Sequence, residues 1–403
     1  MAEIQPFAGI MYNTGRVQLA EVLTQPYDKI TEEMRERYLA ASPYNLVRIE
    51  LGKDQPGDDA ASNKYTRAAG LYRQWLREGI LHRSAKPAFY WLEQTFVPPG
   101  GKQKLTRKGV IGRVRLSRWE EGKILPHEHT LSRPKADRLA LLRAVGAQQG
   151  QIFMLHPDPI PAPKLDRPLF AVVDDYQVVN TLWEITDRDE IARIQAALWP
   201  QTFYIADGHH RYETALAYRE EAGTEASQYV MATLVHMGDP GLGILPTHRT
   251  VSGIAAFDPR KFREAISVNF DLAPWGSAGI GMADALGRVA LRLKDPAAIK
   301  PLFAGKPPLW ETLDVAILHV AILEALLGID EVRLREETNV AYWREPEKAM
   351  EQVLAGKAQL AFFLPPTPVS AVKAVADARS RMPQKSTDFY PKLLSGMVMY
   401  EVR

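Results

Sequence analysis

The residues best suited to chemistry form a short polar run, Asp207–Arg211, directly after the apolar stretch 203–206. This pattern predicts a strand, a tight turn and then a helix with polar side chains at its start. A helix N-terminus presents N–H groups and the positive end of the helix dipole, where anions bind. Arg211 adds a planar fork that suits phosphate or carboxylate. We therefore expect an anion site at this turn.

An ordinary turn is the alternative interpretation of the same residues. Gly208 tolerates positive φ, and Asp207 can bond its own backbone. One of His209 and His210 could be a core side chain. We favour the site, because an acid, two histidines and an arginine fall within five residues at a strand–helix junction.

Further polar residues lie near prolines before residue 131. Tyr27, Asp28 and Asn45 could bind substrate, and turn chemistry explains them equally well. His127 and His129 are two residues apart, so in a strand they share one side and Glu128 points to the other. That spacing suits a metal pair or a base with its orienting partner, and a solvated loop is the alternative.

Two more clusters lie in the second half of the chain. His248 and Arg249 follow a glycine-rich turn and could contact an anion, although a structural arginine is nearly as good an explanation. Lys385, Ser386 and Lys392 could supply phosphate contacts. The glycines of a Walker loop do not precede them, and the chain has no dinucleotide or hydrolase glycine motif. We expect all of these clusters to meet in space.

Composition narrows the function classes. The chain has 403 residues, a formal net charge of +2 and no cysteine. Thiolate chemistry and disulfides are excluded, and a duplex nucleic-acid binder would concentrate Lys and Arg more strongly. The start of the chain lacks a signal-peptide pattern, and no apolar stretch approaches the ~20 residues of a membrane helix. We expect a cytoplasmic protein without nucleic-acid or membrane partners.

Strand-like and helix-like segments alternate, which predicts an α/β or α+β fold of mixed sheets with flanking helices. We expect strands at 46–51, 169–173, 178–185, 228–235, 359–364 and 397–402, a hairpin of 88–97 with 109–116, and helices at 59–78, 132–147, 258–268, 312–327, 347–355 and 368–380. A proline-rich stretch (156–165) and a glycine-rich one (275–282) suggest three regions. These are 1–155, which contributes to the site, 156–274, which carries the turn, and 275–403, an α/β region.

The motifs together resemble a family named only as domain of unknown function ten-fifteen. The stretches that carry the resemblance run nearly end to end. The specific ones are Ala-Asp-Gly-His-His-Arg at 206–211 and Met-Pro-Gln-Lys-Ser-Thr at 382–387. The family name implies no activity.

The Asp207–Arg211 turn is also similar to the phosphate-binding turn of the ParB/sulfiredoxin superfamily, which includes free-serine kinases. This resemblance implies a nucleotide-binding core of that kind with large additions, because the chain extends far on both sides of the motif. Sulfiredoxin activity needs a cysteine nucleophile and is excluded.

The leading hypothesis is a nucleotide-dependent phosphotransferase, a kinase for a small hydroxyl compound, with Mg²⁺ and ATP or ADP. Arg211 and the N–H groups after Gly208 would hold phosphates, with His209 or His210 as phosphate ligand or acid/base, and Asp207 would bind Mg²⁺ or orient a histidine. Glu128 would be the base toward the acceptor hydroxyl if its loop folds over the turn, and Lys385 and Arg249 would clamp charge. Free serine as acceptor comes from the resemblance alone.

Two other function classes remain open. A histidine–carboxylate metal site could catalyse hydrolysis, built from Asp207, His209, His210 and the His127/His129 pair. A nucleotide-binding regulatory module without turnover is the third hypothesis. A homo-oligomer whose oligomeric state changes strongly when nucleotide binds would favour it.

Overall fold

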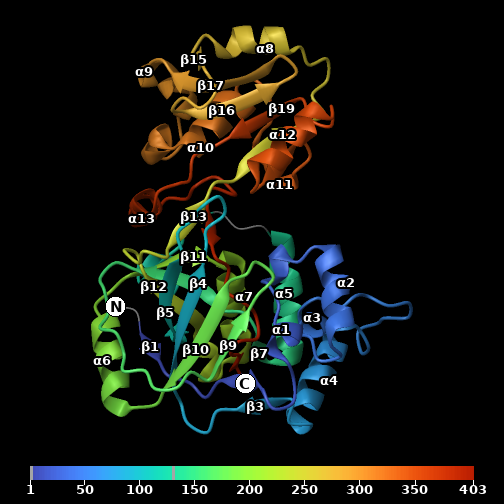
Figure 1. Ribbon diagram of the computed structural model, residues 1–403, viewed down its shortest axis with the longest axis vertical. Coiled ribbons are helices and arrows are strands. Elements are labelled where there is room, and N and C mark those ends of the chain that lie inside the picture. The colour runs from blue at the N-terminus through green and yellow to red at the C-terminus, as the bar shows by residue number, and fades with distance from the viewer. Residues whose placement is uncertain (1–2, 129–131) are drawn as a thin grey trace. The chain divides into compact units, whose positions relative to one another are not determined.

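The computed structural model describes residues 3–128 and 132–403, which fall into two compact units (Figure 1). Unit 1 takes in the described residues of 1–126, 131–243 and 390–403, and unit 2 those of 127–130 and 244–389. Each unit thus combines segments that are far apart in the sequence. The three regions divided at 155/156 and 274/275 follow the chain instead and stay a prediction.

Unit 1 is built on one mixed sheet with the strand order β6-β11-β8-β12-β5-β4-β10-β9, and β1 pairs with β5 beside this path. β12 runs parallel to β8 and β11 parallel to β6, while the remaining pairs are antiparallel. The strands are β1 (Ile4–Gln5), β4 (Phe89–Phe96), β5 (Leu105–Arg115), β6 (Ile124–Leu125), β8 (Ile152–His156), β9 (Phe170–Val173), β10 (Val179–Ile185), β11 (Phe203–Asp207) and β12 (Tyr229–His236).

Two helices bury apolar side chains against this sheet. Ile194 and Leu198 lie one turn apart on α6, and Tyr212 and Ala215 lie on α7; all four join the core cluster formed by the strands. The helices of unit 1 are α1 (Leu19–Val22), α2 (Glu32–Ala41), α3 (Val47–Glu50), α4 (Lys64–Arg77), α5 (Ser132–Val145), α6 (Arg188–Leu198) and α7 (His209–Ala222), with 3₁₀ turns η1 (Tyr27–Lys29), η2 (Trp119–Glu121) and η3 (Ala226–Gln228). Two small sheets pair β2 (Ile10–Tyr12) with β3 (Leu81–Arg83) and β7 (Ala147–Gln148) with β21 (Tyr400–Glu401).

Unit 2 contains a six-stranded antiparallel sheet with the order β15-β17-β16-β19-β14-β18. Its strands are β14 (His248–Val251), β15 (Phe270–Ala273), β16 (Ile280–Asp284), β17 (Gly287–Leu293), β18 (Val340–Trp343) and β19 (Leu360–Phe363). Its helices are α8 (Pro259–Ile266), α9 (Pro296–Ile299), α10 (Asp314–Ile317), α11 (Glu331–Glu336), α12 (Pro346–Leu354) and α13 (Val369–Asp377), and its 3₁₀ turns are η4 (Lys300–Phe303) and η5 (Pro308–Thr312). β13 (Gly243–Leu245) and β20 (Asp388–Tyr390) form a separate two-stranded sheet.

Most elements expected from the sequence are confirmed, and the fold is the mixed α/β architecture expected from the alternating pattern. The hairpin of 88–97 with 109–116 is β4 paired with β5, and the helix expected at 132–147 is α5. The helix expected at 312–327 is α10 followed by a π-helical stretch, Leu318–Glu324. Gly328 ends it with φ +65°, as expected. The strand expected at 397–402 is shortened to β21.

The strand expected at 46–51 is wrong, because this segment contains helix α3. Asn45 decides the difference. Its side-chain oxygen accepts a hydrogen bond from the N–H of Val47 at 2.9 Å, and its amide donates to the carbonyl of Glu21 at 2.7 Å. A side chain that caps the first N–H groups favours a helix start over a strand.

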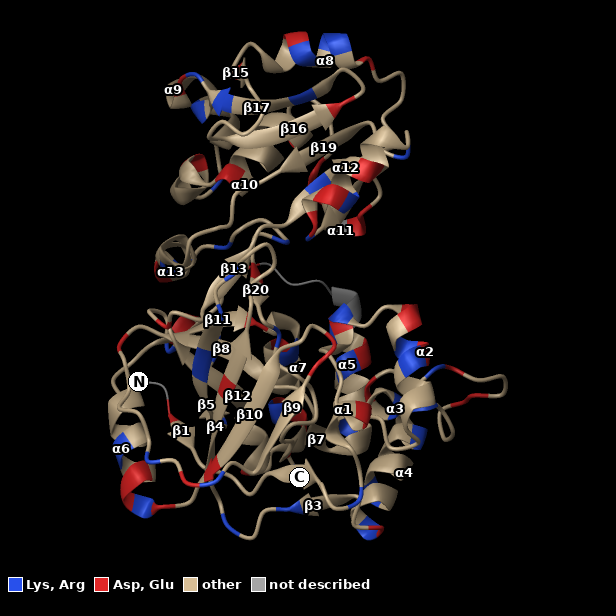
Figure 2. Ribbon diagram, in the orientation of Figure 1, with Lys and Arg blue, Asp and Glu red and all other residues tan. Residues whose placement is uncertain are grey.

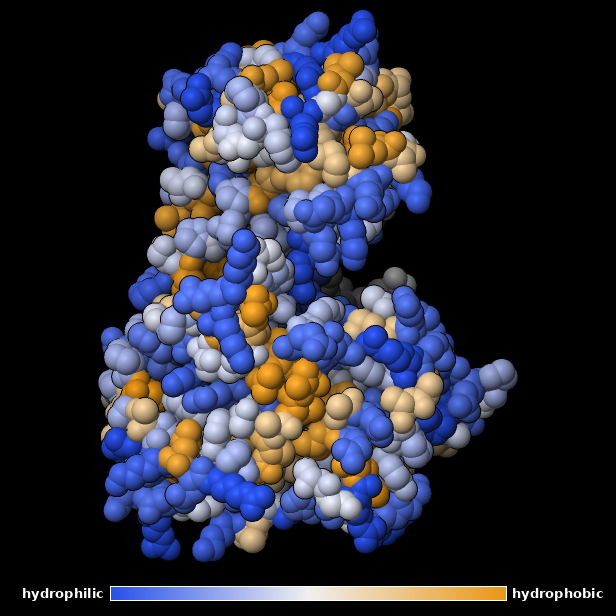
Figure 3. All heavy atoms as spheres, in the orientation of Figure 1, coloured by the Kyte–Doolittle hydropathy of each residue, from blue (hydrophilic) through white to orange (hydrophobic). Residues whose placement is uncertain are grey.

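Positively and negatively charged residues are interspersed along the described part of the chain (Figure 2). Hydrophobic residues gather over β9 and β10 of unit 1 (Figure 3), where Leu169, Val173 and Tyr176 are 40%, 46% and 43% exposed. β9 is last in the strand order, so no further described strand of the sheet covers it. Within the described part of the chain, no helix is both long and apolar enough to cross a membrane.

Candidate functional site

The turn predicted to bind an anion is present as a strand–glycine–helix junction in unit 1. β11 ends at Asp207, and α7 begins at His209. Gly208 joins them with φ +96° and ψ 24°, the left-handed region that favours glycine. A β-carbon at Gly208 would lie 3.1 Å from both an Arg211 nitrogen and the Ile152 side chain. Glycine is therefore required here by backbone conformation and by space.

Arg211 is fixed by two contacts. Its Nη1 donates to the carbonyl of Gln151 at 2.6 Å, and its Nη2 pairs with Asp207 Oδ2 at 3.2 Å. The side chain is 16% exposed. The guanidinium is thus oriented by the carbonyl of Gln151, just before β8, and by Asp207, the last residue of β11. A pre-oriented arginine loses little conformational freedom when it binds a bidentate anion.

Asp207 is surrounded by positive charge. Burial acts to raise its pKa, but the cations Lys392, Arg211 and Lys29 outweigh burial and hold the pKa at about 2, with His209 adding to the effect. Lys392 Nζ lies 3.9 Å from Asp207 Oδ1, and its side chain is buried. Three cations thus act on the carboxylate of Asp207 beside the N-terminus of α7, a setting that suits an anion.

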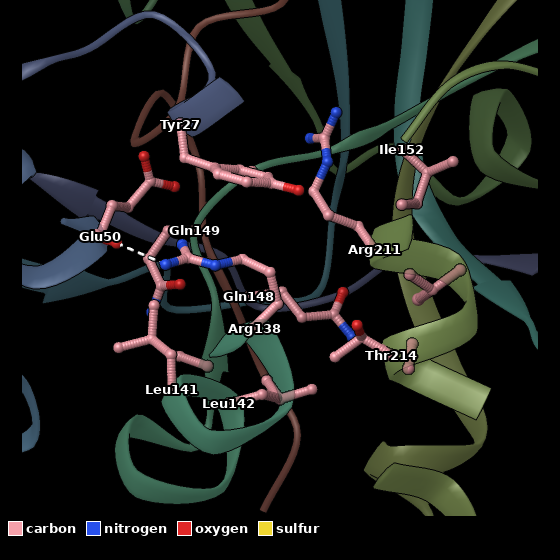
Figure 4. A pocket seen from close by; sticks show the side chains of 14 residues that line it. Tyr27, Glu50, Arg138, Leu141, Leu142, Gln148, Gln149, Ile152, Arg211 and Thr214 are labelled. Carbon is pink, nitrogen blue, oxygen red and sulfur yellow. Dashed lines mark hydrogen bonds between the residues drawn. The ribbon is translucent and has the colours of Figure 1, made fainter. Parts of the chain in front are cut away.

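A small pocket of about 60 Å³ adjoins Arg211 and contains a carboxylate that the sequence analysis missed (Figure 4). Glu50 is buried at the end of α3, and this burial raises its pKa although Arg138, Ser395 and Arg211 act to lower it. Thr24 donates to Glu50 Oε2 at 3.4 Å. A buried carboxylate with a raised pKa beside a fixed arginine has the properties of a general base.

Gly150 lets these groups approach one another. A β-carbon there would lie 3.1 Å from Arg211 Nη1, 3.2 Å from Ser395 Oγ and 3.8 Å from Glu50 Oε1. The arginine, the hydroxyl and the carboxylate therefore share one small space, although 345 positions separate Glu50 from Ser395 in the sequence (395 − 50).

Three further residues predicted in unit 1 are Tyr27, His210 and Asn45. Tyr27 lines the pocket, and its pKa is raised to about 12 by burial and by Asp28. His210 has a pKa lowered by burial, with Glu213 and Asp28 acting in the opposite direction. Asn45 is fully buried in its capping contacts, so it supports α3 and through it Glu50.

The residues predicted in unit 2 form their own network. Arg249 is 1% exposed and donates to the carbonyls of Thr247 and Lys385, the latter at 2.9 Å. Glu128 Oε1 accepts from the N–H of Lys385 at 2.5 Å. Ser386 donates to the carbonyl of Pro383 at 2.5 Å. These contacts join Glu128 and Arg249 through the backbone of Lys385.

Two histidines complete this network. His127 Nε2 lies 2.9 Å from Thr387 Oγ1, and its ring packs against Phe389. His248 accepts from the N–H of Leu364 at 3.3 Å, and burial lowers its pKa to about 4 with help from Arg249. Lys392, by contrast, belongs to unit 1. The structure describes the two networks separately, and their convergence stays a prediction.

Comparison with protein families identifies the chain. A family model described as a protein of unknown function (DUF1015) matches residues 4–316. The protein belongs to this family. The membership expected from the motifs at 206–211 and 382–387 is thereby confirmed. No curated protein matches this DUF1015 chain.

Solved structures with a distant likeness to this DUF1015 protein include three of note. A conserved hypothetical protein from Pyrococcus furiosus is 13% identical, with a TM-score of 0.35 over 70% of this chain and 90% of that chain. A free serine kinase in complex with AMP is 11% identical, with a TM-score of 0.35 over 72% and 92%. SbnI from Staphylococcus aureus, truncated at its C-terminus, is 12% identical, with a TM-score of 0.38 over 71% and 85%. They include the class of kinase that the turn resembles. At these TM-scores the superpositions carry no argument, so the fold class rests on the elements described above.

The hydrolase hypothesis requires a cluster of metal ligands. Within residues 3–128 and 132–403, no group of three or more His, Cys, Asp or Glu side chains is placed to hold an ion. His129, one half of the expected histidine pair, lies outside the described residues. The hydrolase hypothesis therefore gains no support from the described part of the chain.

Sequence reasoning assigned no site role to Glu50, Lys29, Arg138 or the carbonyl of Gln151, although Lys29 and Arg138 lie within polar clusters that it singled out. Glu50 carried a signal, since it is the one acid in the stretch Leu46–Leu51, which is apolar apart from Glu50 and Arg48. Interpreting that stretch as a strand hid it. Gln151 acts through its backbone, so its side chain gave no signal.

Proposed function

We propose that this protein is a nucleotide-dependent phosphotransferase that phosphorylates a hydroxyl group of a small molecule. The observation that carries the proposal is the cluster of three cations, Lys392, Arg211 and Lys29, that act on the carboxylate of Asp207 at the N-terminus of α7. Phosphoryl transfer depends mainly on positioning phosphates and neutralising their charge. Three cations and a helix dipole fit that task.

The residues of unit 1 divide the work as follows. Arg211 and the lysines hold the phosphate oxygens, while Asp207 keeps the cations apart and oriented. The oxygen of the acceptor hydroxyl bonds to the transferred phosphorus, and the bond between that phosphorus and the leaving phosphate breaks. Glu50 accepts the proton of the hydroxyl in this step. We assign the base to Glu50 in place of a histidine of the turn or Glu128, because Glu50 shares a pocket with Arg211, whereas Glu128 holds the backbone of Lys385.

Mg²⁺ fits this proposal as a companion of the nucleotide. It binds phosphate oxygens, keeps several waters and neutralises charge. Asp207 and Asp28 are the carboxylates near the turn that could face it. Because Asp207 already pairs with Arg211 and Lys392, we expect most Mg²⁺ ligands to come from phosphate and water. The similar kinase structures hold AMP or ADP, and the donor proposed here is of that class.

Calorimetric titration of ATP, ADP and CTP with Mg²⁺ tests the proposal. Arg211→Ala should weaken binding about 100-fold, or about 2.8 kcal/mol. Arg219→Ala is the matched control, since Arg219 lies on the same helix and donates to the carbonyl of Leu116 at 3.0 Å, but lies eight residues further along α7 (219 − 211). Its affinity should stay within twofold of wild type.

Phosphorus NMR then separates catalysis from binding alone. Wild type with ATP or ADP and a set of hydroxyl compounds, free serine among them, should form a phosphate monoester. Glu50→Gln should bind nucleotide and form no product. Binding without product for any acceptor would favour a regulatory module, and absence of nucleotide binding by wild type would refute the phosphotransferase proposal.

A further inference from the structure

A second cavity in unit 1 lies beyond the small pocket and is much larger. Its volume is about 280 Å³, and it is bounded by α2, α3, α4 and α5. Its lining includes the apolar residues Ile30, Ile49, Leu51 and Leu141 together with charged residues of both signs. It shares Tyr27, Glu50 and Arg138 with the small pocket beside Arg211.

The two volumes suit different ligands. A water occupies about 30 Å³ of liquid, so the 60 Å³ pocket takes only a few non-hydrogen atoms. The 280 Å³ cavity comes close to the lower end of the 300–1,000 Å³ typical of ligand sites. A small acceptor fills the first, whereas the second has room for a ring system with its substituents.

A rigid partition separates the two spaces. Arg138 lies over the Tyr27 ring with 4.5 Å between guanidinium carbon and ring centroid. It also donates to the carbonyl of Glu50 at 2.8 Å and pairs with Asp137 at 2.5 Å. Tyr65 donates to Asp137 at 2.8 Å from the far side. Because each member is held by the next, the partition keeps its place without a ligand.

The turn η1 connects the cavity to the phosphate-binding turn. Tyr27 lines both spaces, Lys29 acts on Asp207, and Ile30 and Thr31 line the large cavity. An elongated ligand that follows η1 would therefore have its anionic end at Lys29 and Arg211 and its other end over Ile30.

We propose that the large cavity binds the nucleoside part of the phosphate donor. The proposal rests on the proposed function and adds the position of the donor to it. The rings of Tyr27 and Tyr65 and the apolar lining residues suit a flat base, and Asp137 and Lys64 suit the ribose hydroxyls. The small pocket with Glu50 is then left for the acceptor.

The absence of cysteine from the sequence provides a clean test. Leu51→Cys places a single thiol in the lining of the cavity, and Val268→Cys, 71% exposed in unit 2, is the control. The thiol reagent DTNB should react with Leu51→Cys at least fivefold more slowly under saturating Mg²⁺–ATP. Mg²⁺–tripolyphosphate, which lacks the nucleoside, should leave the rate unchanged. Val268→Cys should respond to neither.

A second variant measures affinity instead of protection. Ile30→Trp fills the cavity and should weaken ATP at least tenfold while tripolyphosphate stays within twofold of wild type, whereas Arg211→Ala should weaken both. Equal protection by ATP and tripolyphosphate would overturn the nucleoside assignment, as would unchanged ATP affinity in Ile30→Trp. Protection of Leu51→Cys by serine but not by ATP would assign the cavity to the acceptor instead. If wild type binds neither ATP nor tripolyphosphate, the proposed function itself fails.

Discussion

Arg211 and Arg249 each follow a histidine in the sequence, and the two units surround them differently. Arg211 in unit 1 is 16% exposed and pairs with a carboxylate. Arg249 in unit 2 is 1% exposed and donates to two backbone carbonyls. The same dipeptide therefore supplies a candidate ligand contact in one unit and a brace for the backbone in the other.

The charges around each arginine explain the difference. Near Arg211, the cations Lys392 and Lys29 help to hold the pKa of Asp207 at about 2, so three positive charges cluster at this turn. Burial lowers the pKa of Arg249 to about 10, with Tyr342 and Glu128 opposing it. Arg249 is buried and donates to two carbonyls, so an anion has little access to it, whereas the cations at the start of α7 are placed to attract one.

The largest expected effect is on the stability of unit 2. Arg249→Ala leaves the carbonyls of Thr247 and Lys385 without their donor and opens a cavity, so we expect a loss of about 3 kcal/mol in unfolding free energy. Arg211→Ala should cost about 1 kcal/mol, because its side chain is partly exposed. Urea denaturation followed by far-UV circular dichroism measures both. Arg333→Ala, at an exposed arginine of α11, controls for the loss of positive charge in unit 2. If Arg211→Ala and Arg249→Ala lost equal amounts of unfolding free energy, the two arginines could not be distinguished as a ligand contact and a structural brace.

The second prediction concerns the carboxylate beside Arg211. The pKa of Asp207 is about 2 in the folded protein and about 3.9 in an unfolded chain, so its ionised form contributes about 2 kcal/mol of stability. That contribution is fully present above pH 4 and is lost as the pH falls from about 4 through about 2. Asp207→Asn should therefore be less stable than wild type at pH 6, and the gap should close near pH 2.

Urea titrations of both proteins from pH 6 to pH 2 provide the measurement. A gap that stays constant over this range would mean that the cations around Asp207 do not depress its pKa. Asp284→Asn offers a comparison within unit 2, where Arg263 pairs with Asp284 at 2.8 Å.

Local patterns were enough to predict the turn, since strand, glycine and helix are consecutive. Glu50 required information from far away, because Ser395, Gly150 and Arg211 give its carboxylate a site and Asn45 makes its segment a helix. Pairing of distant segments leaves no mark on local periodicity, so this half of the site could not be predicted.

The motif at 382–392 shows the same limit in another form. Its residues share one stretch of sequence, yet Lys385 belongs to unit 2 and Lys392 to unit 1. The burial of Arg249 likewise depends on Lys385, 136 positions later in the chain. Their residue types suggested phosphate contacts for all of these residues, whereas in the fold they belong to different units.

A third prediction concerns Gly208, with a moderate effect. Its φ of +96° costs an L-residue about 1–2 kcal/mol, and the added methyl would press on Arg211. Gly208→Ala should lower stability by that amount and weaken nucleotide binding as well. Gly223→Ala is the control at the other end of α7. Its φ is +63° and no atom lies within 4 Å of the new β-carbon, so it should lower stability without changing affinity.

The smallest expected effect lies at Lys385. This exposed residue has φ +56°, and its N–H and carbonyl are held by Glu128 and Arg249. Lys385→Gly removes the conformational cost and should raise the stability of unit 2 by up to about 1 kcal/mol. Lys385→Ala keeps the cost and should change stability by less than about 0.5 kcal/mol.

Nucleotide affinity in the same two variants separates a role of the Lys385 side chain from a role of its backbone conformation. If the Lys385 side chain clamps phosphate, both variants weaken ATP by a similar factor, because both lack the ammonium group. If the backbone conformation matters instead, Lys385→Gly alone changes affinity, since glycine lets the loop relax. Unchanged affinity in both variants would mean that only the cations of unit 1 bind phosphate, namely Arg211, Lys29 and Lys392, which act on Asp207. The Glu128–Arg249 brace would then be structural, and the contrast between the two arginines would extend to the whole of each network.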